Sequence, residues 1–304
     1  MGKRERRILL SGASGLIGTA LQRAAQKDSF EITRLVRRHH LAGAGAIYWN
    51  PRRTRSAPHP VEIEGFDALV HLSGANVGRR WTEKYRQDIV ASRVTSTEAL
   101  CECLAGVRHR PPVLLCASAI GIYGDRGDEV LTEESAVGEG FLAETCKAWE
   151  AAARRAGELG IRVVHLRFGV VLSRDGGALN KMLPAFRSGL GGKLGTGRQW
   201  MSWISLRDAV RAILFLIHHD ELSGSFNITA PHPVTNAVFT MELARAVRRP
   251  AILPVPASAL RLVFGEMADA TLLASERVLP QRLMDAGFRF EDEQIGTALT
   301  SLPG

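Results

Sequence analysis

Short apolar runs alternate with longer amphipathic stretches along most of the chain. The strand-like runs are Arg7–Ser11, Glu31–Val36, Ala68–Leu72, Val113–Ala117, Arg162–Phe168 and Ser225–Thr229. The stretches with helical periodicity are Leu16–Ala25, Thr82–Leu104, Phe141–Leu159, which Gly160 would end as a C-cap, and Ser205–His219. Strands that alternate with helices in this way predict a parallel sheet with helices on both faces. The sequence therefore predicts an α/β fold with a doubly wound, Rossmann-type sheet.

Two parts of the chain depart from this alternation. Residues 171–204 are rich in glycine and predict a long, partly irregular segment, which we expect on the substrate side of the fold. Past Pro231 the pattern is mostly helical and is interrupted by prolines. We therefore expect a Rossmann domain at residues 6–230 and a smaller, mainly helical C-terminal domain at residues 231–304.

Composition and charge indicate which kinds of ligand the protein binds. The chain has 304 residues and a net charge of +8, which suits anionic small molecules. Its basic clusters are Lys3–Arg7, Arg34–His40 and Arg52–Arg55, with only Tyr48 and Trp49 nearby. A nucleic-acid surface usually interleaves more aromatic residues with its basic ones, so we expect no nucleic-acid partner.

The same sequence gives no sign of a membrane span, a disulfide framework or a metal site. No stretch approaches the roughly 18 consecutive apolar residues of a membrane-spanning helix, and no secretory signal is evident. The four cysteines form no CxxC pair, and the histidines lack metal-ligand spacing. We expect a cytoplasmic protein without a bound metal.

A glycine-rich turn follows the first predicted strand and opens the first predicted helix. Its sequence is Gly12-Ala-Ser-Gly15-Leu-Ile-Gly18. A tight turn, a close approach to pyrophosphate and close helix packing each require a residue without a Cβ. The residues expected to bind the cofactor here are Gly12, Ser14, Gly15, Leu16, Ile17 and Gly18.

The end of the second predicted strand indicates which dinucleotide is bound. A site selective for NAD has an acidic residue there, which binds the ribose 2′-hydroxyl. This chain has Arg37 and Arg38 and no acid nearby. Because a guanidinium suits a 2′-phosphate, the sequence favours NADP(H). The alternative is that both arginines only face solvent.

Several further motifs resemble a known family. They are Leu72-Ser-Gly-Ala-Asn76, Gly78-Arg-Arg-Trp81, Ser118-Ala-Ile-Gly-Ile-Tyr-Gly124, Lys147-Ala-Trp-Glu150, Arg167-Phe-Gly-Val-Val-Leu172, Gly191-Gly-Lys-Leu-Gly-Thr-Gly197 and Arg277-Val-Leu-Pro280. With the glycine turn, they resemble the extended short-chain dehydrogenase/reductase superfamily and, within it, the epimerase family labelled "predicted nucleoside-diphosphate-sugar epimerase". The resemblance implies an extended Rossmann fold, a C-terminal domain of unknown function and bound NADP(H). It also implies that Leu72, Gly74 and Ala75 contact the cofactor.

The superfamily's catalytic Tyr-x-x-x-Lys pair is incomplete in this chain. Lys147 is present, but Ala143 stands where the tyrosine belongs. The resemblance implies that Lys147 contacts the cofactor ribose. The candidates for supplying the missing proton are Tyr123, Ser118, Glu144, Lys147 and Cys146. Arg167, at the end of a predicted strand, is a candidate to face the substrate, with an inter-strand ion pair as the alternative.

Together these features predict an NADP(H)-dependent oxidoreductase or epimerase. Its substrate would be small and polar, such as a sugar nucleotide. The alternative is a non-catalytic NADP(H) sensor or interaction protein, because the usual tyrosine is missing. The sequence leaves open the identity of the substrate and whether the chain forms a homodimer.

Overall fold

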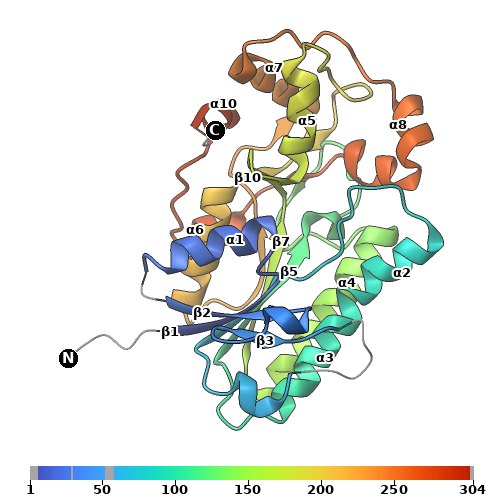
Figure 1. The fold of residues 1–304 in the computed structure, drawn as a ribbon. Coiled ribbons are helices and arrows are strands. Elements are labelled where there is room, and N and C mark those ends of the chain that lie inside the picture. Colours follow the sequence, from blue (N-terminus) through green and yellow to red (C-terminus); the bar gives the residue numbers. More distant parts are fainter. Residues whose placement is uncertain (1–5, 29, 52–57, 302–304) are drawn as a thin grey trace.

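A seven-stranded parallel sheet lies at the centre of the computed structural model, which describes residues 6–28, 30–51 and 58–301 (Figure 1). The strand order is β11-β7-β5-β4-β1-β2-β3, and all six pairings are parallel. The strands are β1 (Arg6–Ser11), β2 (Phe30–Val36), β3 (Ala46–Tyr48), β4 (Ala68–His71), β5 (Val113–Ala119), β7 (Arg162–Phe168) and β11 (Gly224–Ile228). The chain runs outward from β1 in one direction and from β4 in the other. The order therefore reverses between β1 and β4, where doubly wound sheets bind ligands.

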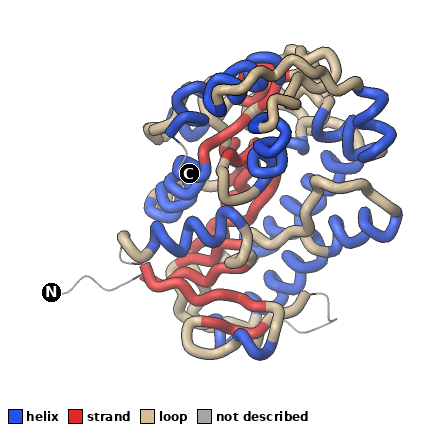
Figure 2. The backbone as a smooth tube through the Cα atoms, turned by 45° about the horizontal axis from the view of Figure 1, so that its top comes forward, coloured by secondary structure: helices blue, strands red, loops and turns tan. Residues whose placement is uncertain are grey.

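Helices cover both faces of this sheet, as Figures 1 and 2 show. Ile8 and Leu10 of β1 pack in a core with α1 and α6, whereas Leu9 faces the opposite core with α3 and α4. The helices of the two layers are α1 (Leu16–Ala25), α2 (Glu83–Ala91), α3 (Val94–Ala105), α4 (Phe141–Arg154) and α6 (Leu206–His218). Strands buried on both faces explain the nearly continuous apolar runs in the sequence. The predicted Rossmann-type fold is confirmed.

The structure refines several predicted boundaries. The helical stretch at Thr82–Leu104 is two helices, because the chain bends at Ser92 and Arg93 between α2 and α3. The end of the Phe141–Leu159 stretch tightens into a 3₁₀ turn and stops at Gly160, whose φ is +79°. The strand β3 was not predicted, because its three residues are too few to show an alternating pattern.

The segments outside the sheet are joined by short strand pairs. β8 (Val170–Leu172) pairs with β10 (Trp203–Ser205), β9 (Trp200–Met201) with β12 (Val234–Thr235), and β6 (Val130–Leu131) with β13 (Arg277–Val278). The remaining helices are α5 (Gly177–Arg187), α7 (Asn236–Val247), α8 (Ala257–Phe264), α9 (Gln281–Asp285) and α10 (Ile295–Ser301). Figure 1 shows α5, α7 and α8 together beyond one edge of the sheet, at the top of the view.

Residues after Pro231 also pack against the sheet layer. Leu283 and Phe288 belong to the same core as Ile8 of β1, and β13 pairs with a segment that follows β5. The chain thus returns to the central fold near its end. None of the helices in the described part of the chain is long and apolar enough to cross a membrane.

Candidate functional site

The turn between β1 and α1 has room for backbone only. Gly12 has a φ of +73°, and a Cβ on it would lie 2.7 Å from the backbone carbon and oxygen of Leu72. A Cβ on Gly18 would collide with the carbonyl oxygen of Gly12. The amide of Gly15 donates to that same carbonyl at 2.9 Å, which closes the turn. Glycine is therefore required at both Gly12 and Gly18.

The exposed side of this turn leaves backbone donors for an anion. Gly15, the residue before α1, places no side chain over the first helical turn, so the leading N–H groups of the helix are uncapped. Ser14 and Gly15 are exposed, whereas Gly18 is buried against the turn. A helix N-terminus of this kind attracts phosphate through its N–H groups and its dipole. The turn therefore fits a dinucleotide pyrophosphate.

A second loop, at the end of β4, borders the glycine turn. Leu72 touches Gly12, and the following residues are held by the start of α3. Arg93 donates from Nη2 to the carbonyl of Ala75 at 3.1 Å, and the amide of Ala75 donates to Ser92 Oγ at 2.9 Å. The loop that contains Leu72, Gly74 and Ala75 is thus fixed beside the glycine turn.

Arg37 and Arg38 lie directly after β2, on the other side of the turn. Both side chains are exposed. Within the described part of the chain, neither guanidinium pairs with a carboxylate or donates a hydrogen bond. Because β1 and β2 are adjacent and parallel, their carboxyl ends share one edge of the sheet. Two uncompensated positive charges therefore lie near the glycine turn, on the side where a 2′-phosphate is expected.

Ser118, Tyr123 and Arg167 lie together in a buried polar network. Arg167 donates from Nε and Nη2 to Glu150 of α4, at 2.8 and 3.0 Å. Ser118 Oγ donates to the same carboxylate at 2.8 Å. The third guanidinium nitrogen, Nη1, donates to the Tyr123 hydroxyl at 2.9 Å, and that hydroxyl donates to Asn227 Oδ1 at 2.7 Å. The network joins β5, β7, β11 and α4.

The electrostatics of this network hold its groups in one protonation state. Burial alone would raise the pKa of Glu150, but the hydrogen bonds and charge of Arg167 outweigh it and lower that pKa. Burial raises the pKa of Tyr123, and the nearby Arg167 offsets this only in part. Arg167 forms the ion pair that was the alternative to a substrate contact, although its partner lies on a helix rather than on a neighbouring strand. Its contacts account for all of its nitrogens.

The first half of α4 carries the position of the missing tyrosine. Ala143 is buried, and Lys147, one turn later, has a side chain that is 60% exposed. Its ammonium lies 3.8 Å from Glu144, a loose pair that leaves it able to reach a ligand. Burial raises the pKa of the Cys146 thiol to about 12, so this thiol stays protonated near neutral pH.

Glu276 is a candidate site residue that sequence reasoning missed. It precedes β13, and its Oε1 lies 3.8 Å from the place where a Cβ on Gly121 would stand. Gly121 follows β5, so this carboxyl lies at the carboxyl-end edge of the sheet. No spacing in the sequence links residue 276 to residue 121, because only the folded chain brings them together.

Segments far apart in the sequence also meet around this edge. A Cβ on Gly177, at the start of α5, would lie 3.2 Å from Leu16 Cδ2 of α1. Lys181 of α5 donates from Nζ to the carbonyl of Gly78 at 3.2 Å, and Arg80 donates from Nη1 to the carbonyl of Leu262 in α8 at 2.8 Å. The glycine-rich segment at 171–204 and the C-terminal region thus both contribute to the surroundings of the site.

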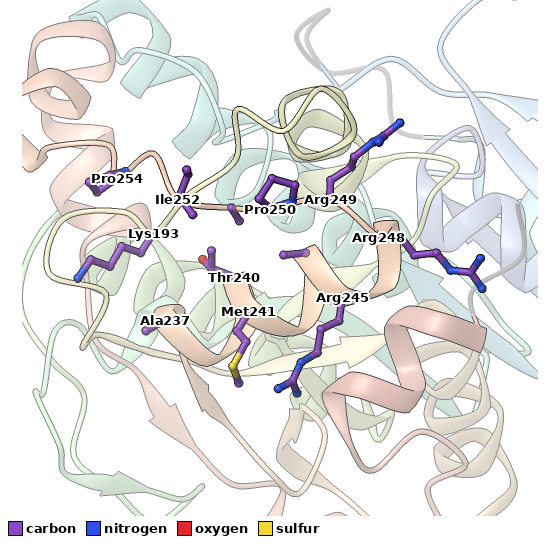
Figure 3. A pocket seen from close by; sticks show the side chains of 12 residues that line it. Lys193, Ala237, Thr240, Met241, Arg245, Arg248, Arg249, Pro250, Ile252 and Pro254 are labelled. Atoms are coloured by element: carbon purple, nitrogen blue, oxygen red, sulfur yellow. The ribbon is translucent and has the colours of Figure 1, made fainter.

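A separate pocket of about 700 Å³ lies in the C-terminal region, around α7 and the loop after it (Figure 3). Figure 3 shows that the side chains of Lys193, Arg245, Arg248 and Arg249 point in different directions rather than toward one another. A phosphate site requires converging donors. The pocket therefore does not compete with the glycine turn as a dinucleotide site.

The sheet order, the glycine turn and the adjoining β4 loop define a Rossmann protein with an NAD(P)-binding fold. The chain belongs to the NAD dependent epimerase/dehydratase family, whose sequence model matches residues 8–229. A model of a domain of unknown function matches residues 255–302. The predicted family, with its C-terminal domain of unknown function, is confirmed.

Individual relatives match along nearly the whole chain. An epimerase family protein of Mycobacterium bovis is 46% identical over 301 residues, or 98% of each chain. The crystal structure of a human epimerase family protein with NADPH has a TM-score of 0.89 and 31% identity, covering 97% of this chain and 98% of that one. A nucleoside-diphosphate sugar epimerase from Corynebacterium glutamicum has a TM-score of 0.78 and 35% identity, covering 97% of this chain and 57% of that one.

Proposed function

We propose that this protein is a cytoplasmic, NADP(H)-dependent oxidoreductase or epimerase that acts on a small polar substrate, such as a sugar nucleotide. The observation that carries the cofactor choice is the pair Arg37 and Arg38, which follow β2, are exposed and have no carboxylate partner among the described residues. The similar human protein, which was solved with NADPH, supports the same choice. The sugar-nucleotide class is supported by the description of the similar Corynebacterium protein.

The residues present have defined tasks in this proposal. The uncapped start of α1 and the glycine turn bind the pyrophosphate, and Arg37 and Arg38 neutralise the 2′-phosphate. The loop at Leu72–Asn76 borders the ribose and nicotinamide half, where Lys147 donates to ribose hydroxyls. NADP(H), when bound, supplies or accepts the hydride. The segments around α5 and α8 then enclose the substrate beside the strand ends.

The cofactor choice is tested by measuring the affinities of NADPH and NADH for the wild type and for the Arg37→Asp variant. We expect the wild type to prefer NADPH. Arg37→Asp should weaken the affinity for NADPH about tenfold or more, because it replaces an attractive charge with a repulsive one. It should change the affinity for NADH little. Arg108→Asp, an exposed arginine in the loop before β5, is the control and should leave both affinities unchanged. Equal affinities of the wild type for NADPH and NADH would contradict the proposal.

A non-catalytic NADP(H) sensor is the second candidate, and one observation favours it. Ala143 replaces the usual tyrosine, while Ser118 and Tyr123 are held in the buried network around Glu150. The two candidates differ in turnover. Oxidation of NADPH in the presence of a carbonyl compound or sugar nucleotide supports the enzyme. Tight binding of NADPH with no turnover across a broad panel of substrates, together with a partner protein whose capture depends on NADPH, supports the sensor.

A further inference from the structure

The carboxyl group of Glu276 lies where the active site lacks a proton donor. Its Oε1 is 3.8 Å from the position of a Cβ on Gly121, in the loop after β5. That same position is 3.5 Å from Leu142 Cβ of α4, the residue before Ala143. Glu276 therefore lies beside the loop after β5 and near α4, the helix that carries the position of the missing tyrosine.

The backbone around Glu276 holds it firmly at this place. Its amide donates to the carbonyl of Trp200 at 3.1 Å, and its carbonyl accepts from Ser202 Oγ at 2.7 Å. Ser275 is also tied to the loop after β5, because its Oγ donates to the carbonyl of Gly127 at 2.6 Å. The backbone at Ser275 and Glu276 is thus fixed by two segments distant in the sequence, one at Trp200–Ser202 and one at Gly127.

The carboxyl itself has no partner in the described part of the chain, neither an ion pair nor a hydrogen bond. The side-chain polar atoms there that are both sealed from solvent and unpaired are Trp49 Nε1 and His165 Nδ1. The Glu276 oxygens are not among them, so this unpaired carboxyl keeps some exposure to solvent. A partly buried carboxyl without a partner costs stability, and such groups concentrate at functional sites.

The surroundings of Glu276 favour its neutral form near neutral pH. Burial, followed by the negative charge of Asp125, raises the pKa of Glu276 to about 8. Cys146 of α4, whose thiol is protonated, is close enough to interact with Glu276. Asp128 accepts a hydrogen bond from the Trp200 ring nitrogen at 2.7 Å. The guanidinium of Arg277 is stacked over the Trp200 ring at 4.3 Å. A pKa close to the working pH suits a group that both gives and takes a proton.

We propose that Glu276 is the catalytic acid and base of this protein, in place of the missing tyrosine. This inference rests on the proposed function. In reduction, the Glu276 carboxyl would donate its proton to the oxygen of a substrate carbonyl, and bound NADPH would supply the hydride that the carbonyl carbon accepts. The products are an alcohol, NADP⁺ and a carboxylate, which regains its proton from solvent. In the oxidation direction, the carboxylate removes the proton of the alcohol.

The other candidates fit this task less well. Tyr123 and Ser118 are engaged in the Glu150–Arg167 network, and burial holds the Cys146 thiol protonated. Lys147 and Glu144 are both exposed and form a loose pair at 3.8 Å, and Lys147 is suited to a ribose contact. Glu276 differs from all of these candidates in combining three features. Its carboxyl is unpaired within the described residues, it is partly buried, and it lies beside the loop after β5.

A test without any substrate compares the binding of NADP⁺ and NADPH as pH changes. The oxidised nicotinamide ring is positively charged and lowers the pKa of a facing carboxyl, whereas the reduced ring is neutral. The affinity for NADP⁺ relative to NADPH should therefore rise as pH increases through the window below about 8, and level off above it. A downward shift of one pKa unit gives a rise of about tenfold. The 2′-phosphate is common to both nucleotides, so its titration cancels in the ratio.

Matched variants assign the pH dependence to one residue. Glu276→Gln should abolish it, and Glu158→Gln, at an exposed position before β7, should keep it. Asp125→Asn should move the rise to lower pH, because it removes the charge that raises the pKa of Glu276. A ratio that is independent of pH in the wild type, or one that still rises in Glu276→Gln, overturns the assignment and leaves the proposed function intact. Failure of both nucleotides to bind overturns both.

Discussion

Replacing Gly18 with alanine is expected to weaken nucleotide binding strongly. A Cβ at this position collides with the carbonyl oxygen of Gly12 and would lie 2.9 Å from Ala13 Cα. Both partners are backbone atoms of the turn itself, so relief requires the turn to open or α1 to move. We expect a loss of at least roughly a hundredfold in NADPH affinity, about 2.7 kcal/mol, measured by fluorescence titration.

Gly160→Ala is the control for a general effect of removing a glycine. Gly160 has a φ of +79°, so alanine is strained there, but nothing lies within 4 Å of its Cβ position. It follows α4 before β7 begins, at the opposite edge of the sheet. This variant should lose about 1 kcal/mol of stability and bind NADPH normally. A Gly18→Ala protein that is folded by circular dichroism and binds like the wild type would exclude the turn as the nucleotide site.

The second large effect is expected on stability, at the buried pair of Arg167 and Glu150. Their side chains are 9% and 4% exposed, and removal of either leaves the other as an unpaired buried charge. Arg167→Met and Glu150→Met should each lower the free energy of unfolding by about 3–5 kcal/mol. The double variant should be more stable than the sum of the two losses predicts, since it removes both charges. Urea unfolding measures all three.

An exposed ion pair is the matched control for this cycle. The side chains of Arg261 and Asp269 are 57% and 50% exposed. Arg261→Met should therefore lower the free energy of unfolding by no more than about 1 kcal/mol. NADPH affinity separates a structural role of Arg167 from a role in ligand binding. If Arg167→Met unfolds like the wild type while turnover or ligand binding collapses, the arginine belongs to the substrate site rather than to the core.

Much of the fold could be predicted because a parallel sheet leaves a strong pattern in the sequence. Strands such as β4 and β5 are buried on both faces, and each gives a short apolar run between helices. Local pattern fails where an element is short or bends. β3 has three residues, and the break between α2 and α3 falls at Ser92 and Arg93, where the Arg93 guanidinium donates to the carbonyl of Ala75. That contact is tertiary and leaves no periodic signal.

The nucleotide half of the candidate site was accessible from sequence for a similar reason. Gly12, Gly15 and Gly18 are close in the chain, and their spacing reports a local turn. The catalytic half of the site could not be predicted from the sequence. Tyr123 and Ser118 have suitable chemistry, yet their environment is set by Glu150 and Asn227 on other elements.

Glu276 shows the same limit most clearly. It lies in a C-terminal stretch that the family resemblance covered without assigning it a role. Its environment comes from Gly121, Leu142 and Trp200, which the sequence does not connect. Both its raised pKa and its place at the sheet edge are therefore properties of the folded chain.

The most direct test of the central claim is a crystal structure of this protein with NADPH. The pyrophosphate should lie on the Gly12–Gly18 turn, with the 2′-phosphate beside Arg37 and Arg38 and the nicotinamide near Gly121 and Glu276. Nucleotide density elsewhere, such as in the pocket lined by Lys193 and Arg245, or no nucleotide at a saturating concentration, would contradict the account.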